Sequence, residues 1–425
     1  MMAPHTQPDA GLLELSAGEA IAMMRQGDLR AEDYATALLA RCDAGRDLNA
    51  FISISPDAVK EAARAADRRR SAGGVRGPLH GLPIPIKDSV NTSDYPTTSG
   101  TAALRNFRPK HDAPLVRALR EAGGIVLGKT NLQEMSLGYT STNMAFGAVK
   151  NPYDPGRIPG GSSGGTAVAV SARMAPLGVA EDTCGSIRVP AALCGIAGFR
   201  PTTLRYPPGG VMPLTPLFDT LGPHARTVAD IVLFDSVITG DFDPPRPVLP
   251  REVRLAVSPP QYFTDLDPEV ARVTSEALKK LRDAGVSFVE AEVPDLAGLV
   301  DAANFPIICH DTVPMITRYL REFEAGVTFE QLLAMIGENV REPLEARAFP
   351  GRRLWVTQEA YAAARDIHRP ALQEAFRVYF GGTGVSAIAY PTTLVPAPPI
   401  GQDQEVEISG KKLSFRAAMS RNIAP

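Results

Sequence analysis

The sequence predicts an α/β protein with a mixed or parallel sheet, because helix and strand patterns alternate along most of its length. Residues 112–122 carry apolar side chains at helical spacing, the glycines at 123–124 end that pattern, and residues 125–127 are a short apolar strand. The same order returns later: a helix begins after the capping residue Asp267, and a strand follows it at residues 286–289. Such alternation is typical of layered α/β folds.

Two shifts in composition divide the chain. Residues 240–252 are rich in proline and charge, so they are expected to form a linker between an N-terminal part, 11–240, and a second part, 253–425. The pattern from residue 300 to residue 380 is mainly helical. Residues 385–390 have the pattern of a buried strand, which a proline cluster ends.

The composition argues against several classes of protein. The chain has 425 residues, with 44 Lys and Arg against 47 Asp and Glu, and this near-balance argues against a nucleic-acid-coating surface or a polybasic membrane patch. Hydrophobic residues make up 44%, which excludes a disordered chain. The four cysteines lack zinc-binding spacing, so we expect reduced thiols, no metal and no cofactor. They are Cys42, Cys184, Cys194 and Cys309.

The N-terminal residues contain no basic region followed by a long apolar run, so no secretory signal is expected. No stretch approaches the ~18 apolar residues of a membrane span. We therefore expect a soluble, cytoplasmic protein, a monomer or homodimer, without a nucleic-acid or membrane partner. Residues 1–10 are expected to be a mobile tail.

Residues 123–130, GGIVLGKT, match the phosphate-binding pattern G-x-x-x-x-G-K-[ST]. That motif requires a loop between its glycines, whose N–H groups point at phosphates. Here residues 125–127 favour a buried strand, and a helix rather than a strand precedes Gly123. Lys129 is therefore expected to be structural.

Residues 160–164, GGSSG, match the G-x-S-x-G nucleophile elbow of α/β-hydrolases, which would indicate an esterase. An elbow needs a strand directly before it, but residues 151–159 contain three prolines and cannot be a central strand. A helix is expected at residues 166–172, as the elbow requires. No downstream histidine lies in a catalytic context.

Three polar residues suit hydrolysis without histidine. Lys87 ends the apolar segment GLPIPIK, where burial would disfavour its ammonium form and lower its pKa. A neutral lysine can act as a general base for a serine hydroxyl. Ser162 lies in the run GGSSGG, and Ser186 follows it by 24 residues in the segment DTCGSIRVP.

Taken together, these segments resemble the amidase signature family, closely over residues 75–235 and traceably from residue 11 to the end. The resemblance implies a single domain over residues 1–425, with the catalytic core at 75–235. Its fold would be a large, mixed, twisted sheet covered by helices on both faces. The matching segments are residues 160–201, GKTNLQE at 128–134 and LGPHARTVAD at 221–230.

By this resemblance, Ser186 is the nucleophile, Ser162 the bridging serine and Lys87 the base of a Ser-cisSer-Lys triad. Ser162 would accept a proton from Ser186, give its own to Lys87 and later return one toward the leaving amine, over hydrogen bonds of ~2.6–3.2 Å. In the family the peptide bond before the bridging serine is cis, and Gly161 makes that geometry easier to accommodate. Ser163 is expected to support the site.

The resemblance also implies an oxyanion hole made of backbone N–H groups in one loop. Many relatives have glycine at the position of Cys184, and the thiol could narrow the pocket. Asp182 and Arg188 flank the nucleophile and are expected to brace the loop through a buried ion pair or backbone hydrogen bonds. The expected oxyanion donors are Thr183, Cys184, Gly185 and Ser186.

The reaction implied is hydrolysis of an amide-type C–N bond through an acyl-enzyme. Residues 206–219 are apolar and proline-rich, which favours a hydrophobic or aromatic substrate, as in mandelamide- or indoleacetamide-type amidases, anilide amidases or urethane hydrolases acting on carbamates. The alternative within the family is a glutamine-hydrolysing amidotransferase subunit, which needs a partner subunit. A binding module on an inactive scaffold is disfavoured, because all three catalytic positions are filled.

The helical region 300–380 matches no family pattern and holds several aromatic residues, so it is expected to shape the acyl or leaving-group pocket. Relatives usually continue past residue 425 with a further strand and helix. We therefore expect either a shortened chain or a reduced C-terminal layer. The expected pocket residues are Phe305, Ile308, Leu332 and Ile336.

Overall fold

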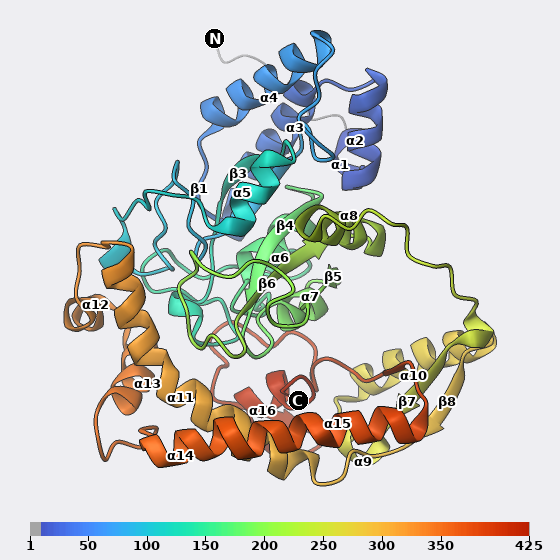
Figure 1. The fold of residues 1–425 in the computed structure, drawn as a ribbon, viewed down its shortest axis with the longest axis vertical. Helices are drawn as coiled ribbons and strands as arrows, with labels where there is room; N and C mark the ends of the chain where they lie inside the picture. Colours follow the sequence, from blue (N-terminus) through green and yellow to red (C-terminus); the bar gives the residue numbers. More distant parts are fainter. Residues whose placement is uncertain (1–9, 425) are drawn as a thin grey trace. The chain divides into compact units, whose positions relative to one another are not determined.

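The computed structural model describes residues 10–424, and the contacts within it divide the chain into two compact units (Figure 1). The tail expected at residues 1–10 lies outside the described residues, except for Ala10, where the first helix begins. Unit 1 comprises Met1–Asp243 and Thr317–Val340, and unit 2 comprises Pro244–Ile316 and Arg341–Pro425.

Unit 1 is built on a six-stranded mixed sheet with the strand order β1-β3-β2-β4-β6-β5. Strand β2 is parallel to β3 and β4, while the β1–β3, β4–β6 and β5–β6 pairs are antiparallel. The predicted α/β class with a mixed sheet is therefore confirmed. The strands are β1 (Phe51–Ser53), β2 (Pro83–Lys87), β3 (Ile125–Thr130), β4 (Leu177–Asp182), β5 (Ala197–Gly198) and β6 (Thr220–Ala225).

Strands β2, β3 and β4 are buried along their whole length, which explains their nearly continuous apolar sequences. The strand expected at residues 125–127 is confirmed and extends to Thr130, so the GGIVLGKT segment is strand rather than phosphate-binding loop. Lys129 is buried, pairs with Asp88 at 3.2 Å and donates to the Val90 carbonyl at 2.7 Å. Lys129 is therefore one partner of a buried ion pair.

Helix α6 (Gly164–Ser171) packs against β2, β3, β4 and β6, and every one of its residues is buried. A helix that is apolar all round belongs in a core. A Cβ on Gly165 would lie 2.2 Å from the Asn131 carbonyl oxygen, so glycine permits this close approach. The predicted helix at residues 166–172 is thus confirmed, starting two residues earlier.

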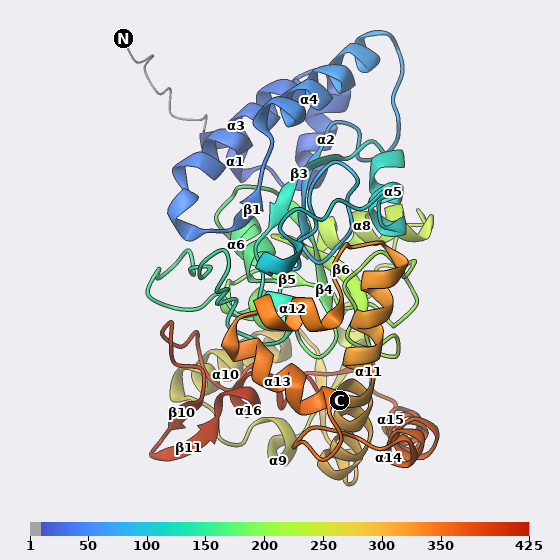
Figure 2. The same cartoon turned by 90° about the vertical axis from the view of Figure 1, so that its left-hand side faces the viewer.

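The remaining helices of unit 1 include an N-terminal group, α1 to α4, drawn in blue in Figures 1 and 2. Helix α5 starts at Pro114, slightly later than the pattern from residue 112 indicated, because Ala113 is its N-cap. The helices are α1 (Ala10–Glu14), α2 (Ala17–Gln26), α3 (Ala31–Ala44), α4 (Pro56–Ser71), α5 (Pro114–Glu121), α7 (Arg188–Leu193), α8 (Val228–Thr239) and α12 (Phe329–Met335).

Unit 2 contains a three-stranded parallel sheet, ordered β8-β7-β9, and a β10–β11 hairpin. Asp267 caps the helix that follows it, as predicted, by accepting a hydrogen bond from the Glu269 backbone. The strand expected at residues 385–390 is only two residues long, since its pairing with β7 ends before Pro391. The strands are β7 (Arg254–Val257), β8 (Ser287–Glu290), β9 (Ala387–Ile388), β10 (Glu405–Ile408) and β11 (Lys411–Ser414).

The region 300–380 is mainly helical, as predicted, and two of its helices run from one unit into the other: α11 and α13. Residues 240–252, between α8 and β7, are all exposed. No helix within residues 10–424 is both long and apolar enough to cross a membrane. The helices that lie wholly or partly in unit 2 are α9 (Pro259–Tyr262), α10 (Pro268–Asp283), α11 (Leu296–Glu322), α13 (Glu338–Ala348), α14 (Gln358–Ala363), α15 (Arg369–Thr383) and α16 (Phe415–Ser420).

Candidate active site

Lys87 is the last residue of β2, and its side chain is completely buried. Its Nζ lies 2.6 Å from the Ser162 hydroxyl and 2.8 Å from Oε2 of Glu181. Burial lowers the pKa of Lys87, because it disfavours the ammonium form, while the Glu181 carboxylate acts in the opposite direction. Lys87 is therefore in direct contact with one of the two serines that the motifs singled out.

Ser162 lies in the loop before α6, and the peptide bond that joins it to Gly161 is cis. A Cβ on Gly161 would lie 2.8 Å from the carbonyl carbon of Tyr139 and 3.0 Å from the nitrogen of Thr140. These distances are too short for any side chain, so the backbone of a neighbouring loop requires glycine at this position.

Ser141 holds the same loop from the other side. Its hydroxyl donates to the Gly160 carbonyl at 2.8 Å and accepts from the Gly164 N–H at 3.0 Å. Ser141 has φ of 55°, in the left-handed region that residues with a side chain rarely adopt. No sequence motif pointed to Ser141, because it stands in a stretch with no recognisable pattern.

Ser186 follows β4 and is 7% exposed, in contrast to the fully buried Lys87 and Ser162. Its carbonyl accepts a hydrogen bond from the Ser163 N–H at 3.3 Å, so the two serine segments are joined through their backbones. The Ser163 hydroxyl donates to the Glu181 carbonyl at 3.0 Å. Ser163 thus ties the loop before α6 to the end of β4.

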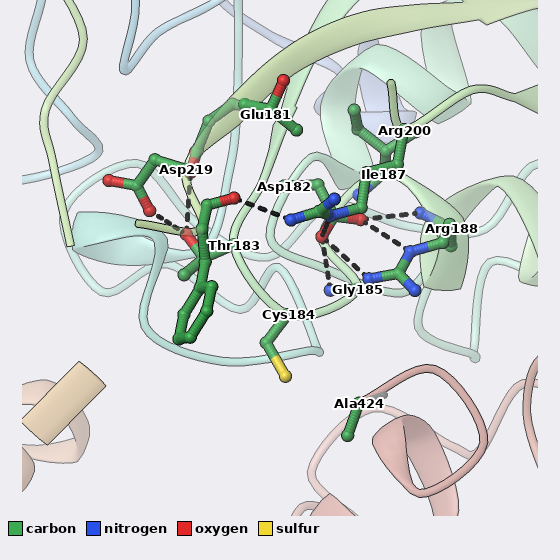
Figure 3. Close-up of polar contacts among 12 residues, drawn as sticks. Glu181, Asp182, Thr183, Cys184, Gly185, Ile187, Arg188, Arg200, Asp219 and Ala424 are labelled. Carbon is green, nitrogen blue, oxygen red and sulfur yellow. Dashed lines mark hydrogen bonds and ion pairs between the residues drawn. The ribbon is translucent and has the colours of Figure 1, made fainter. Parts of the chain in front are cut away.

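Asp182 organises the loop that follows β4 (Figure 3). Its buried carboxylate accepts from the backbone N–H groups of Gly185 at 2.6 Å and Ile187 at 3.0 Å. It also pairs with Arg188 at 3.1 Å and Arg200 at 3.2 Å. Burial alone would raise the pKa of Asp182, but the two arginines outweigh it and hold that pKa well below its usual range.

The expected brace by Asp182 and Arg188 thus takes the form of an ion pair plus backbone hydrogen bonds, with Arg200 as a partner that the motifs did not indicate. Gly185 has φ of 119°, a conformation that favours glycine. Its N–H, one of the expected oxyanion donors, points at Asp182 in this structure. The Cys184 carbonyl accepts from the Tyr139 hydroxyl at 2.9 Å, and its thiol points away from the Asp182 carboxylate in Figure 3.

Glu181 is a buried acid that the sequence motifs missed. Its carboxylate accepts from Lys87 and from the Ser136 hydroxyl at 3.1 Å. The Thr183 hydroxyl donates to Asp219 at 2.6 Å, and its oxygen lies 3.3 Å from Oε1 of Glu181, between the two acids in Figure 3. The available signal was an acidic pair at the end of the apolar strand segment LGVAED.

Two further buried residues, Asp219 and His224, have pKa values shifted from the usual ones. Burial, together with the neighbouring Glu181, raises the pKa of Asp219 to about 7. By contrast, burial lowers the pKa of His224 to about 4, so its imidazole is neutral, and its Nε2 lies 2.8 Å from the Ile187 carbonyl. Among residues 10–424 no three His, Cys, Asp or Glu side chains gather where they could hold a metal ion.

The four expected pocket residues fall in different units. Leu332 and Ile336 are buried in unit 1, whereas Phe305 and Ile308 are half-buried on the part of α11 that belongs to unit 2. The guanidinium of Arg416 lies 4.7 Å from the centre of the Phe305 ring. A pocket shared by these residues stays a prediction.

Comparisons with known proteins point to one family. The family profile described as Amidase matches residues 33–420. The chain is 35% identical over 410 residues to the indoleacetamide hydrolase of Rhizobium radiobacter, covering 96% of this chain and 87% of that protein. It is 37% identical over 394 residues to the mandelamide hydrolase of Pseudomonas putida, covering 90% of this chain and 77% of that protein. A solved structure described as "Crystal structure of amidase" matches with a TM-score of 0.86 and 31% identity, over 97% of this chain and 89% of that one.

Proposed function

The chain belongs to the amidase family and is an amide-hydrolysing enzyme, and from this premise we propose that it works through Ser186, Ser162 and Lys87. In this mechanism Ser186 attacks the substrate carbonyl and forms an acyl-enzyme. The observation that carries the proposal is the 2.6 Å hydrogen bond between Lys87 Nζ and the Ser162 hydroxyl, which joins two fully buried side chains.

The proposed proton path uses no histidine. As Ser186 Oγ bonds to the carbonyl carbon, its proton passes to Ser162 Oγ, and the Ser162 proton passes to the neutral amine of Lys87. When the C–N bond breaks, the protons run back and the leaving amine takes one. Water then attacks the acyl ester by the same path and releases the carboxylic acid and the free Ser186 hydroxyl.

The developing oxyanion needs donors close to Ser186. We assign this role to backbone N–H groups of the loop from Thr183 to Ser186, which Asp182 holds in place. The Gly185 N–H would have to turn from Asp182 to take part, because it donates to that carboxylate in this structure. A backbone donor of this kind contributes about 3 kcal/mol to transition-state stabilisation.

For the substrate we propose a small amide with an aryl or otherwise hydrophobic group, with anilides and aryl carbamates as further candidates. Two relatives are named for hydrolysis of indoleacetamide and mandelamide, both amides that carry an aromatic ring. The apolar, proline-rich segment at residues 206–219 fits such a group. We also propose that the enzyme acts in the cytoplasm, as a monomer or homodimer, without a cofactor.

The two alternatives have less support. The esterase hypothesis needs a strand directly before the elbow, but residues 158–163 are in no strand, and α6 follows a loop. The glutamine-hydrolysing hypothesis needs polar groups for a carboxamide side chain, and residues 206–219 offer mainly apolar ones. Glutamine therefore serves as the discriminating substrate below.

The test is a comparison of kcat/KM for indole-3-acetamide, mandelamide, an anilide, an aryl carbamate and glutamine. We expect Ser186→Ala to reduce turnover of every substrate to background and Lys87→Met to lower kcat by about 10²–10⁴-fold. The matched control is Ser171→Ala, which removes a buried hydroxyl that bonds to the Cys194 carbonyl; this variant should remain active. Substantial turnover by Ser186→Ala would refute the proposed nucleophile, and a preference for glutamine would refute the proposed substrate class.

A further inference from the structure

We propose that Glu181 is a positioning residue for Lys87: its carboxylate holds the amine against Ser162 and sets the pH at which that amine becomes a neutral base. The inference rests on the proposed role of Lys87 as the base. It adds a fourth side chain to the catalytic arrangement, one that neither carries the proton nor touches the substrate.

The geometry ties Lys87 to Glu181 at two oxygen atoms. The Nζ donates to Oε2 of Glu181 at 2.8 Å and lies 3.5 Å from its backbone carbonyl, while its third contact is the Ser162 hydroxyl at 2.6 Å. The two residues lie on the adjacent parallel strands β2 and β4. Glu181, on the neighbouring strand, therefore fixes the direction in which the Lys87 amine points.

Glu181 is itself held in place. The Ser136 hydroxyl donates to Oε2, the oxygen that Lys87 contacts, and the Thr183 hydroxyl oxygen lies 3.3 Å from Oε1. Ser136 has φ of 57°, again in the left-handed region. With Lys87 and Ser136 both bonded to Oε2 and the whole side chain buried, the carboxylate has little freedom to turn, so it can fix the amine of Lys87 rather than follow it.

The charge of Glu181 has a strong effect on Lys87 because both side chains are shielded from solvent. The side chain of Lys87 is 0% exposed and that of Glu181 1% exposed. In such surroundings a carboxylate stabilises the ammonium form of its partner and makes the neutral form a stronger base. It also provides the counter-charge when Lys87 takes the Ser162 proton during the reaction.

Among residues 10–424, Glu181 is the acid whose carboxylate contacts the Lys87 amine. Asp182 is neutralised by two arginines, and His224 is uncharged. Asp219 makes no hydrogen bond to the Lys87 amine and contacts the cluster through the Thr183 hydroxyl, while burial and the neighbouring Glu181 raise its pKa. The charges of Glu181, Asp182 and Asp219 stabilise the ammonium form of Lys87, and the charge of Lys87 in turn disfavours protonation of His224.

The experiment is the pH–rate profile of Glu181→Gln, measured as kcat and KM with the best amide of the substrate panel. Glutamine keeps the shape and removes the charge, so the ammonium form of Lys87 loses its counter-charge. We expect the acidic limb of the kcat profile to move to lower pH by about 1–3 units. We also expect a lower plateau, since the amine becomes a weaker base, and an unchanged KM. A purely structural role would lower kcat at every pH without moving the limb.

Three companion variants make the result decisive. Asp219→Asn should move the limb less than Glu181→Gln does, because Asp219 does not touch the amine. Glu181→Asp keeps the charge on a shorter side chain, so it should keep the limb near its wild-type position and lower kcat; it also tests the inference if the glutamine variant does not fold. Lys87→Met reports on the proposed base itself.

The outcomes separate cleanly. A limb that stays in place or moves upward in Glu181→Gln overturns the inference, as does an equal shift in Asp219→Asn or an undiminished kcat in Glu181→Asp. An active Lys87→Met variant overturns instead the proposed function on which the inference rests.

Discussion

At Lys87, burial and a neighbouring carboxylate act in opposite directions on one amine. Burial is the larger influence, and the pKa of Lys87 is therefore lowered. Neutral amine is the form that can accept the Ser162 proton. The proposed mechanism can therefore run without histidine at a pH where an exposed lysine would be charged.

The first prediction follows from the lowered pKa of Lys87. Turnover by the wild-type enzyme should rise with pH as Lys87 loses its proton, and the midpoint should lie clearly below the ~10.4 of a free lysine. The measurement is kcat against pH with an aryl amide. A midpoint near the ~6.5 of histidine that disappears on replacing a single histidine would point to a histidine base instead.

The second prediction concerns Gly161. In Gly161→Ala the new Cβ would meet the backbone of Tyr139 at 2.8 Å, so the loop that carries Ser162 must shift. We expect overpacking to destabilise the protein by about 1–3 kcal/mol and kcat to fall sharply. The control is Gly381→Ala in α15, where, apart from the adjacent backbone of the helix itself, no atom lies within 4 Å of the place that a Cβ would occupy, and alanine favours the helix. Equal melting temperatures and rates in both variants would show that the site does not depend on this close approach.

The sequence motifs indicated Lys87, Ser162, Ser186 and the brace by Asp182, because those residues stand in short segments with recognisable spacing. They could not indicate Glu181 or Ser141. The contact between Lys87 and Glu181 joins residues 94 apart and exists only because β2 pairs with β4. Contacts of this kind depend on strand order, which local patterns do not contain.

Among the elements, the loop between β4 and α7 depends most on a single side chain. The buried Asp182 carboxylate accepts three backbone hydrogen bonds there, from Gly185, Ile187 and Arg188, and forms ion pairs with two arginines. The loop conformation is therefore coupled to one ionised carboxylate.

The third prediction is the effect of Asp182→Asn on stability. Removing one partner of a buried ion pair typically costs about 3–5 kcal/mol, and we expect a loss of this order near neutral pH. Because the pKa of Asp182 is lowered on folding, its contribution is complete above the unfolded-state value of ~3.9 and is lost as the pH falls through the folded-state value. The difference in melting temperature between wild type and variant should therefore shrink as the solution becomes strongly acidic.

The control for this variant is Asp43→Asn. Asp43 also pairs with an arginine, Arg46, but both side chains are largely exposed, so its replacement should change stability by no more than about 0.5 kcal/mol. A melting-temperature difference for Asp182→Asn that matches this control would contradict the assigned role of Asp182.

Elements with strong local signals were predicted well. The buried strand β3, the helix α6 and the Asp267-capped helix α10 were each foreseen from apolar runs, glycines and caps. The short strands β1 and β5 were not, because two or three residues carry no period. Strand β9 is shorter than its apolar run, since the length of a strand depends on the partner it pairs with.

At the scale of the whole chain, unit 1 is assembled from two separate stretches of sequence. Residues 317–340 return to it after the chain has passed through part of unit 2. The Tyr319 hydroxyl donates to Asn91, and the Gly337 N–H donates to Glu134 at 3.1 Å. No sequence motif indicated this return, because such long-range contacts leave no local pattern.

The fourth prediction uses this arrangement. Residues 240–252 are exposed, and Phe242 is 58% exposed, so limited chymotrypsin digestion should cut there first. The two fragments should remain together in size-exclusion chromatography under native conditions, because residues 317–340 belong to the second fragment and pack within unit 1. Fragments that separate without denaturant would contradict this description of unit 1.

The most direct test of the central claim is to locate the acyl group on the enzyme. A slowly hydrolysed aryl ester or amide would be mixed with the wild-type protein, quenched in acid and analysed by intact mass and peptide mapping. The proposed mechanism predicts one added acyl group, on Ser186, and none in the Ser186→Ala variant. An acyl group found on Ser162, Ser163 or Cys184 instead would contradict it.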